Sequence, residues 1–324
     1  MGEFASIEAF VREFPRLRAP LGPGDDAAVV PSSSSAVCVT TDAVVEGVHF
    51  RRADGPLSDV GHKALAVNLS DLAAMGARPI WFLCALAAPS LTLEEARALG
   101  RGMAALARRF RVALLGGNVT RAPALSLTLT AAGTTGRRAP LLRSGGRPGD
   151  TLFVSGTLGG ARLGLRSLRV RGPGRRFKAA ERRQRRPEPR VALGLLAARY
   201  ASAAIDVSDG LLQDLGWLLR ASSVGAEVEL SHIPLDADVV RAFPRKGQAL
   251  RMALTGGEDY ELLLAVPPRR ARAFARACAR AGEVVTAIGR LVPGRGLRLW
   301  DADGRPSPLS VSGFDHFRAR RPAP

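Results

Sequence analysis

A short apolar run that ends in oxygen-bearing side chains most constrains the fold and chemistry of this chain. Ala36-Val37-Cys38-Val39 is rich in β-branched residues and predicts a strand, and Thr40-Thr41-Asp42 follows it directly. The end of a strand is a rigid place to hold ligands, and this one offers two hydroxyls and a carboxylate. Hard cations such as Mg²⁺ prefer oxygen ligands. The stretch therefore predicts part of a magnesium site.

Acidic residues recur in four further clusters beside glycine, serine or apolar runs. The clustered acids, with those of the first stretch, are Asp25, Asp26, Asp42, Glu46, Asp71, Asp206, Asp209, Asp214, Glu258, Asp259 and Glu261. Carboxylates next to a core are costly unless they are paired or bind metal. Too few basic residues lie inside these motifs to pair with them all. Turns and helix caps explain any one of these acids, but together they favour several divalent cations that hold a polyphosphate.

The chain length of 324 residues favours two domains, and Arg147-Pro148-Gly149-Asp150 indicates a turn between them. We therefore expect domains at residues 1–147 and 148–324. Both halves alternate strands with helices. The periodicity predicts an N-terminal helix over 4–14, further helices over 59–75, 93–110, 191–200, 211–222 and 268–281, and strands over 80–87, 112–115, 125–133, 151–155, 203–209, 228–230 and 261–266.

Location is predicted from what the sequence lacks. No apolar run approaches the length of a membrane span, and the N-terminus has no signal-peptide pattern. The three cysteines, Cys38, Cys84 and Cys278, are far apart and form no Cys-x-x-Cys pair. We therefore expect buried thiols in a cytoplasmic protein that does not bind membranes.

The net charge of +18 invites a nucleic-acid hypothesis. Residues 162–190 hold twelve Lys or Arg against two acids, so this single run contributes +10 of the excess. A local run of charge is typical of a solvated loop or helix face. Aromatic residues, the usual stacking platforms for bases, make up only 5% of the chain. We therefore expect no nucleic-acid partner and interpret residues 166–186 as an exposed, mobile excursion.

The common nucleotide-binding motifs are missing. The chain has no G-x-x-x-x-G-K-[ST] and no G-x-G-x-x-G, and none of its three lysines follows a glycine-rich loop. The motifs of protein kinases are also absent. No histidine pair has zinc-ligand spacing, and no histidine near Ser208 supports a hydrolase triad. If ATP binds, metals, backbone amides and an arginine such as Arg143 must hold its phosphates.

Five motifs closely resemble those of the thiamine-monophosphate kinase family. They occur in the family's order, and the resemblance covers the chain from about Phe4 to Phe317. The motifs are Gly24-Asp25-Asp26-Ala27-Ala28, Thr40-Thr41-Asp42, Asn68-Leu69-Ser70-Asp71-Leu72-Ala73-Ala74-Met75-Gly76-Ala77, Ile205-Asp206-Val207-Ser208-Asp209-Gly210-Leu211 and Thr255-Gly256-Gly257-Glu258-Asp259-Tyr260-Glu261-Leu262. The wider superfamily includes aminoimidazole ribonucleotide synthetase and selenophosphate synthetase, but the Glu258 motif and the terminal Gly313-Phe314-Asp315-His316-Phe317 favour the kinases.

The resemblance implies ATP-dependent phosphorylation of thiamine monophosphate to thiamine diphosphate, with several Mg²⁺ ions. It implies an α+β fold of two α/β domains, in which the N-terminal sheets pair in a homodimer and the C-terminal domain is a mixed sheet with flanking helices. No residue is assigned as an obligatory base. The implied metal ligands are Asp25, Thr40, Thr41, Asp42, Asp71, Asn118, Asp206 and Asp209; the ATP contacts are Gly117, Asn118, Arg143 and Ser208; the substrate contacts are His49, Glu258 and Phe314.

Two features depart from the family pattern. Asn118 stands where the family usually has aspartate, so one ligand loses its charge and one metal site is weakened. The Arg-rich run, residues 166–186, is also longer than the resemblance leads us to expect. Two other readings stay open: another ATP-using synthetase of the aminoimidazole ribonucleotide synthetase type, and an RNA-binding protein that uses the Arg-rich run.

Overall fold

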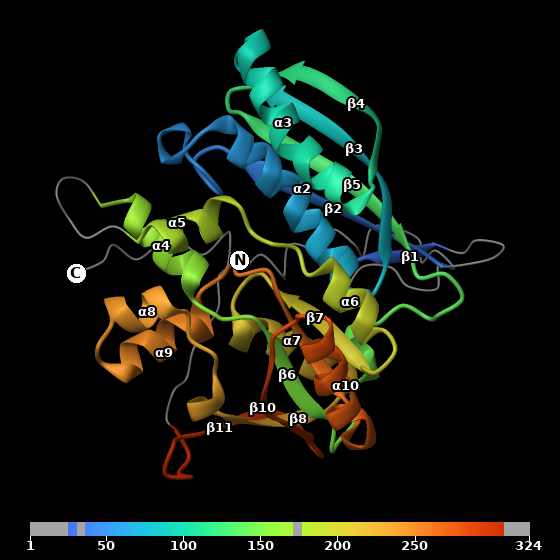
Figure 1. Ribbon diagram of the computed structural model, residues 1–324, viewed down its shortest axis with the longest axis vertical. Coiled ribbons are helices and arrows are strands. Elements are labelled where there is room, and N and C mark those ends of the chain that lie inside the picture. Colours follow the sequence, from blue (N-terminus) through green and yellow to red (C-terminus); the bar gives the residue numbers. More distant parts are fainter. Residues whose placement is uncertain (1–24, 31–35, 171–176, 308–324) are drawn as a thin grey trace.

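A computed structural model describes residues 25–30, 36–170 and 177–307 (Figure 1). The helix predicted over 4–14 and the predicted substrate contact Phe314 lie outside these residues. Within them, no helix is both long and apolar enough to cross a membrane.

The first half of the chain forms a five-stranded sheet in the order β1-β2-β5-β3-β4. All neighbouring strands are antiparallel except β3 and β4, which are parallel. Helices α2 and α3 lie side by side, and α2 packs against the sheet (Figure 1). The bounds are β1 Ala28–Val30, β2 Val37–Val45, α2 Leu57–Ala74, β3 Arg78–Ala88, α3 Leu93–Phe110, β4 Ala113–Arg121 and β5 Ser126–Thr134.

The two helices of this half differ in how much of their surface is buried. Most residues of α2 are buried, because the helix packs on α3, on the sheet and on the second half of the chain. Helix α3 buries only a narrow stripe that includes Leu99 and Leu106. Thr92 and Glu95 form a capping box at its start, which satisfies two backbone N–H groups.

The second half forms a six-stranded mixed sheet in the order β11-β8-β10-β6-β9-β7, in which only β8 and β11 are parallel neighbours. Its strands are β6 Thr151–Ser155, β7 Ala203–Val207, β8 Gly225–Glu229, β9 Glu261–Val266, β10 Val285–Val292 and β11 Gly296–Trp300. Its helices are α4 Gly160–Leu168, α5 Lys178–Arg185, α6 Val191–Ala197, α7 Leu211–Ser222, α8 Ala237–Ala242, α9 Lys246–Thr255 and α10 Pro268–Arg280.

A hydrophobic core joins the two halves. It continues from the first sheet through α2 and α6 to residues of the second sheet and α10, including Phe153, Leu264 and Phe274. A separate core contains residues of α7 and α9 and other side chains of the second sheet, such as Leu152 and Leu263. The predicted fold class, two α/β units with a mixed C-terminal sheet and flanking helices, is therefore confirmed.

One predicted strand is too short, and two helices were missed. The strand predicted over 112–115 continues through Gly116-Gly117-Asn118 to Arg121. Gly117 has a packing reason to lack a side chain, because an added Cβ would lie 1.9 Å from the carbonyl oxygen of Cys84 on β3. Helices α8 and α9 were not predicted, since both are short and mix polar with apolar residues.

Of the predicted exposed, mobile excursion over 166–186, residues 171–176 lie outside the described residues. The interpretation is wrong for residues 166–168, which end helix α4 and include the buried Ser167, and for residues 177–186. Residues 177–186 contain helix α5, which packs along α4 and buries Ala180, Glu181 and Gln184. Their arginines meet acids: Arg183 pairs with Asp236, and Arg185 pairs with Asp59. Charge density alone suggested a solvated run, because the acids that pair with it lie far away in the sequence.

Candidate active site

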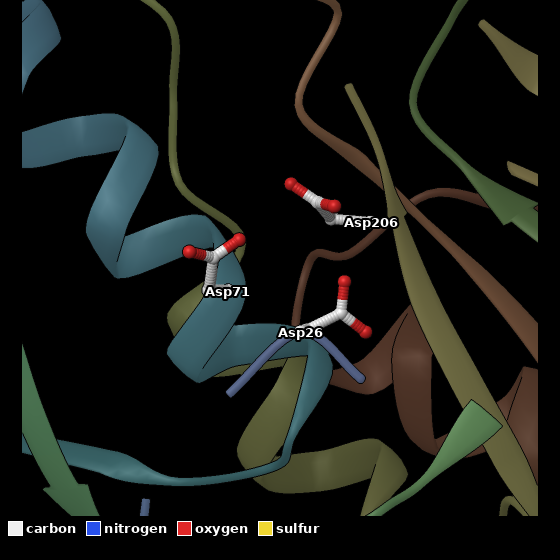
Figure 2. Close-up of side chains that lie close together, drawn as sticks. All are labelled: Asp26, Asp71 and Asp206. Atoms are coloured by element: carbon white, nitrogen blue, oxygen red, sulfur yellow. The ribbon is translucent and has the colours of Figure 1, made fainter. Parts of the chain in front are cut away.

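Three carboxylates converge between the two halves of the molecule. Asp26 precedes β1, Asp71 lies near the end of α2, and Asp206 lies on β7 (Figure 2). One oxygen from each lies within 4.8 Å of the other two. Asp26 and Asp206 are buried, and Asp71 is half-buried. Three elements that are far apart in the sequence therefore build one oxygen-rich site.

Two hydroxyl groups orient these carboxylates. The Thr40 hydroxyl donates to Asp71 Oδ2 at 2.6 Å, and the Ser70 hydroxyl donates to Asp206 Oδ2 at 2.7 Å. Thr40 lies on β2, whereas Ser70 precedes Asp71 on α2. Each bond fixes one carboxylate oxygen and leaves lone pairs on the group for a further ligand.

Burial and neighbouring negative charges raise the pKa of Asp71, Asp206 and Asp25. Burial is the largest cause for Asp71, whose pKa is well above its usual range, and the charges of Asp206, Asp42 and Asp26 add to it. Burial and then the charge of Asp26 raise the pKa of Asp206 to about 8. Burial and the neighbouring Asp26 likewise raise the pKa of Asp25 to about 6. The site therefore favours the binding of positive charge.

Arg143 supplies a positive charge at this cluster. Its guanidinium donates to Asp26 Oδ1 at 2.8 Å, and its backbone N–H donates to Asp25 Oδ2 at 3.0 Å. Burial acts to lower the Arg143 pKa, but Asp26, Asp25 and Asp206 raise it overall. Arg143 was predicted as an ATP contact; Asp26 was not among the predicted ligands. The adjacent pair Asp25-Asp26 was the available signal, but it did not show which carboxylate enters the cluster.

The predicted ligands on β2 divide between its two faces. Side chains alternate along a strand, so Thr40 and Asp42 share a face and Thr41 points the other way. The Thr41 hydroxyl donates to the carbonyl oxygen of Leu129 on β5, at 3.0 Å. Asp42 lies near enough for its charge to raise the pKa of Asp71 and Asp206. The structure thus brings Thr40 and Asp42 to the cluster but directs the Thr41 side chain away from it.

The residues after β7 are joined to the loop before β9. The Glu258 N–H donates to the Ser208 carbonyl oxygen at 2.6 Å, and the Tyr260 N–H donates to the Val207 carbonyl oxygen at 2.9 Å. Asp209 accepts from the Gln213 side chain at 2.9 Å. Glu258 and Tyr260 have φ angles of 70° and 49°, which side-chain-bearing residues seldom adopt. The two motifs that carry Ser208, Asp209 and Glu258 are therefore neighbours in space.

Glu258 lies beside the pocket that contains His49. Lys63 Nζ is 2.5 Å from Glu258 Oε1 and donates to the carbonyl oxygen of His49 at 3.2 Å. His49 Nδ1 accepts the Val45 N–H at 3.0 Å. The pocket is lined by His49, Phe50, Lys63, Leu165, Leu168 and Gln184, among others. Two predicted substrate contacts, His49 and Glu258, are thus linked through Lys63.

Gly117 and Asn118 do not reach the carboxylate cluster within the chain. They lie on β4, the edge strand of the first sheet, and β3 and β5 separate it from β2. Every residue of β4 is exposed. Their placement was not predictable from the Gly-Gly-Asn sequence, because the same residues fit a phosphate loop and a strand.

The arrangement fits divalent cations bound by oxygen ligands. Three carboxylates and a neighbouring fourth, Asp42, gather around few positive charges, and burial together with the charges of neighbouring acids raises the pKa of Asp71 and Asp206. Magnesium is bound in proteins by one or two carboxylates together with water and substrate phosphates. The donors present, all oxygens, match that preference. The site can therefore hold cations that neutralise a polyphosphate.

Family models match both halves of the chain. The model "AIR synthase related protein, N-terminal domain" matches residues 24–135, and "AIR synthase related protein, C-terminal domain" matches residues 147–302. The fold and site thus define a protein of the AIR synthase related class.

Similar individual proteins narrow that class. The chain is 38% identical to thiamine-monophosphate kinase of Escherichia coli K12 over 326 residues, which cover 98% of each chain. A solved structure of AaThiL complexed with AMPPCP and TMP superposes with a TM-score of 0.86, at 32% identity and with coverage of 98% and 97%. The crystal structure of thiamine-monophosphate kinase from Stenotrophomonas maltophilia K279a superposes with a TM-score of 0.78, at 39% sequence identity. The match covers 94% of this chain and 98% of that one. The chain belongs to the thiamine-monophosphate kinase family.

Proposed function

We propose that the protein phosphorylates thiamine monophosphate to thiamine diphosphate, with ATP as the phosphate donor. The observation that carries the proposal is the convergence of Asp26, Asp71 and Asp206 in a buried site with few positive charges. The relative complexed with AMPPCP and TMP supports the two substrates, because it covers nearly the whole chain.

The expected reaction is a direct in-line transfer. The acceptor is itself a phosphate, so little proton abstraction is needed, and we assign no obligatory base. The obstacle is repulsion between two anions, which positioned positive charges reduce. Bound Mg²⁺ supplies most of that charge. The residues proposed to hold it are Asp25, Asp26, Thr40, Thr41, Asp42, Asp71, Asp206 and Asp209, with Thr41 limited to its backbone oxygen because its hydroxyl is engaged on β5.

The two substrates are proposed to bind on either side of this cluster. Arg143 and Ser208 are the proposed ATP contacts, with Gly117 and Asn118. Arg143 is held at the cluster by Asp25 and Asp26 and can exchange those partners for phosphate oxygens. His49 and Glu258 are the proposed contacts of the thiamine monophosphate. Phe314, the third proposed substrate contact, lies outside the described residues.

Pairing of two chains along the first sheet is part of the proposal. On β4, Leu114, Leu115 and Val119 are 59%, 63% and 69% exposed, and β4 is an unpaired edge. An exposed apolar edge strand is a template for pairing with another chain. Because Asn118 lies apart from the cluster of its own chain, its proposed role as a ligand depends on this pairing. The proposed division is into a pairing, metal-binding and ATP-binding domain, 1–147, and a domain that completes the site, 148–324.

A cytoplasmic location completes the proposal. It is supported by the three cysteines, none of which forms a disulfide among the residues that the structure describes; Cys38 and Cys278 are fully buried. Free thiols fit a reducing compartment. Fractionation of cells that express the tagged protein tests this point.

A coupled assay of ADP formation tests the proposed reaction. We expect turnover with thiamine monophosphate and Mg²⁺, and none with free thiamine or with an aminoimidazole ribonucleotide precursor. Excess EDTA should abolish turnover, and added Mg²⁺ should restore it. Equal rates with free thiamine, or full activity in EDTA, would contradict the proposal. Turnover with the aminoimidazole precursor alone would instead favour a synthetase of the same superfamily.

A further inference from the structure

We infer that Gln184, in the Arg-rich run, is a positioning residue for substrate recognition, because it holds the carboxylate of Glu258 in place. The inference rests on the proposed function, since Glu258 is a proposed substrate contact. It assigns a role to helix α5, which charge alone did not suggest. It also places a residue of the Arg-rich run beside the substrate pocket.

Two side chains from different elements hold Glu258. Gln184 Nε2 on α5 donates to Glu258 Oε2 at 2.5 Å, and Lys63 Nζ on α2 lies 2.5 Å from Glu258 Oε1. Gln184 is 3% exposed and Lys63 is 2% exposed, so water competes little with either contact. Each carboxylate oxygen therefore has its own partner, and the group is held from both sides.

The chemistry of the pair fixes the orientation of the Gln184 amide. An ionised carboxylate only accepts hydrogen bonds, so the amide must turn its NH₂ group toward Glu258. The amide oxygen of Gln184 is buried and has no hydrogen-bond partner among the described residues. Gln184 also lines the pocket that contains His49. The residue thus combines a contact with Glu258, an unsatisfied acceptor and a place in the pocket wall.

The surrounding ion pairs fix the position of α5. Arg185 and Arg186 contact the two oxygens of Asp59 on α2, at 2.9 and 3.0 Å. Arg183 contacts Asp236 at 3.0 Å and donates to the Thr157 hydroxyl, also at 3.0 Å. Gln184 therefore sits between residues that attach α5 to both halves of the molecule. We assign these arginines the role of holding Gln184 against Glu258.

The backbone of Glu258 makes this support necessary. Its φ of 70° is unfavourable for a residue with a Cβ, and its N–H donates to the carbonyl oxygen of Ser208, two residues after Asp206 of the carboxylate cluster. A carboxylate at position 184 would repel Glu258 and displace its side chain. An apolar side chain there would remove the donor without adding charge.

The test compares two substitutions with a matched control. Gln184→Glu replaces the amide donor with a second negative charge at nearly constant size, and Gln184→Met removes the hydrogen bond at similar volume. Gln248→Glu is the control. Gln248 is exposed on α9, so this substitution adds the same negative charge away from Glu258. Steady-state kinetics, calorimetric binding of thiamine monophosphate and of an ATP analogue, and thermal unfolding are measured for all three variants and for the parent protein.

We expect Gln184→Glu to raise the KM and Kd for thiamine monophosphate by about tenfold or more, the equivalent of one lost hydrogen bond to a charged group. Gln184→Met should give a smaller increase of the same kind. The KM for ATP should stay within about twofold of the parent value, since the ATP contacts are not touched. Gln248→Glu should match the parent protein in every measurement.

Two results would contradict the role of Gln184. If both Gln184 variants keep the parental KM and Kd for thiamine monophosphate, the inference is wrong. If they lose thermal stability and kcat while the KM for both substrates is unchanged, Gln184 only stabilises the fold and the inference is also wrong. If Gln184→Glu does not fold, Gln184→Met decides alone. Failure of the parent protein to phosphorylate thiamine monophosphate would instead overturn the proposed function.

Discussion

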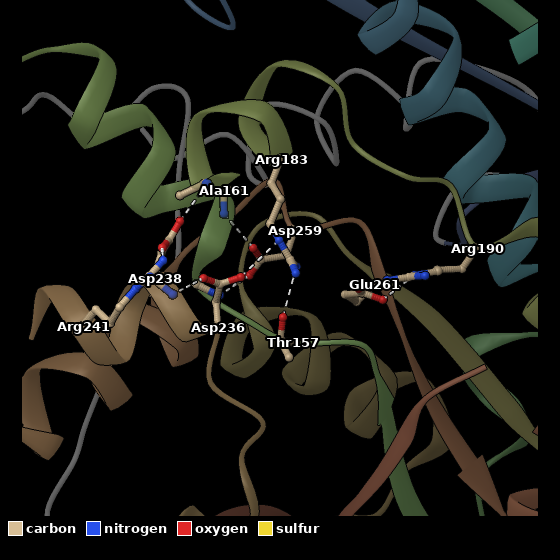
Figure 3. A network of polar contacts seen from close by, with 11 residues as sticks. Thr157, Ala161, Arg183, Arg190, Asp236, Asp238, Arg241, Asp259 and Glu261 are labelled. Atoms are coloured by element: carbon tan, nitrogen blue, oxygen red, sulfur yellow. Dashed lines mark hydrogen bonds and ion pairs between the residues drawn. The ribbon is translucent and has the colours of Figure 1, made fainter. Parts of the chain in front are cut away.

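Two groups of buried acids in this molecule differ in what surrounds them. In the carboxylate cluster, one oxygen each of Asp26, Asp71 and Asp206 lies within 4.8 Å of the other two; Asp26 pairs with Arg143, whereas Asp71 and Asp206 accept from neutral hydroxyl groups. In the network around α5 and β9, each acid has a basic or amide partner: Glu261 meets Arg190 at 2.6 Å, and Asp236 meets Arg183 at 3.0 Å (Figure 3).

This difference in partners distinguishes acids that can bind cations from acids that stabilise the fold. A buried carboxylate with a guanidinium partner is largely neutralised within the chain. A buried group of carboxylates without enough partners destabilises the folded state until cations arrive. The sequence contains both kinds in similar surroundings of glycine, serine and apolar residues. Only the pattern of partners distinguishes them, so substitutions in the two groups should have opposite consequences.

The largest expected effect on turnover comes from Asp206→Asn. This change removes one charge from the cluster but keeps the size of the side chain. We expect kcat to fall by at least about 10²-fold, as for the loss of one preorganised electrostatic group. The free energy of unfolding in EDTA should be unchanged or increased, because repulsion within the cluster decreases. Urea unfolding in EDTA and the ADP assay in Mg²⁺ measure the two quantities; a folded variant with near-parental kcat would remove Asp206 from the site.

Glu261→Gln should produce the reverse pattern. Glu261 accepts from Arg190 and from the Ser155 hydroxyl, and it is 3% exposed. Without the charge of Glu261, the half-buried Arg190 loses its charged partner, so we expect a loss of about 2–3 kcal/mol in the free energy of unfolding. Turnover per folded molecule should stay within a few-fold. Denaturant unfolding and active-site-normalised rates check this. Unchanged stability would show that paired acids do not support the fold as we argue.

Asp259 should give a smaller, pH-dependent effect. Burial raises its pKa from 3.8 to about 7, although it accepts the N–H groups of Gly159 and Ala161. The folded state therefore binds this proton more tightly than the unfolded state, and the resulting stabilisation is full below pH 3.8 and lost as the pH rises through about 7. Asp259→Asn should flatten the decline of unfolding free energy over that window. Urea unfolding at a series of pH values measures the slope; equal slopes would contradict the assignment.

The smallest expected effect comes from Asn118→Asp. If pairing of two chains brings residue 118 to a metal, the added charge should lower the Mg²⁺ concentration for half-maximal rate. The difference should fade at saturating Mg²⁺, because an amide oxygen also coordinates. Magnesium titrations of both proteins measure it. If the titrations superimpose, Asn118 is not a weakened ligand, and its position on the exposed strand β4 reflects another role.

Local sequence predicted the elements wherever the periodicity was strong. Helices α3 and α7 and strand β9 begin and end at the predicted residues. The five acidic motifs and their resemblance to a family predicted the class of reaction and most of the residues now found near the cluster. These signals are local, since a helix face, a cap or a motif is complete within some ten residues.

The sequence did not reveal the partners of its charges. It could not predict that Asp26 enters the carboxylate cluster while Asp25 accepts the backbone N–H of Arg143, or that the Thr41 hydroxyl turns toward β5. Nor did it predict that the Arg-rich run meets Asp59, Asp236 and Glu258. Composition and motif order determined the fold class and the chemistry. Tertiary structure alone decided which acids are neutralised, because the energy of a charge depends on neighbours that are brought together only by folding.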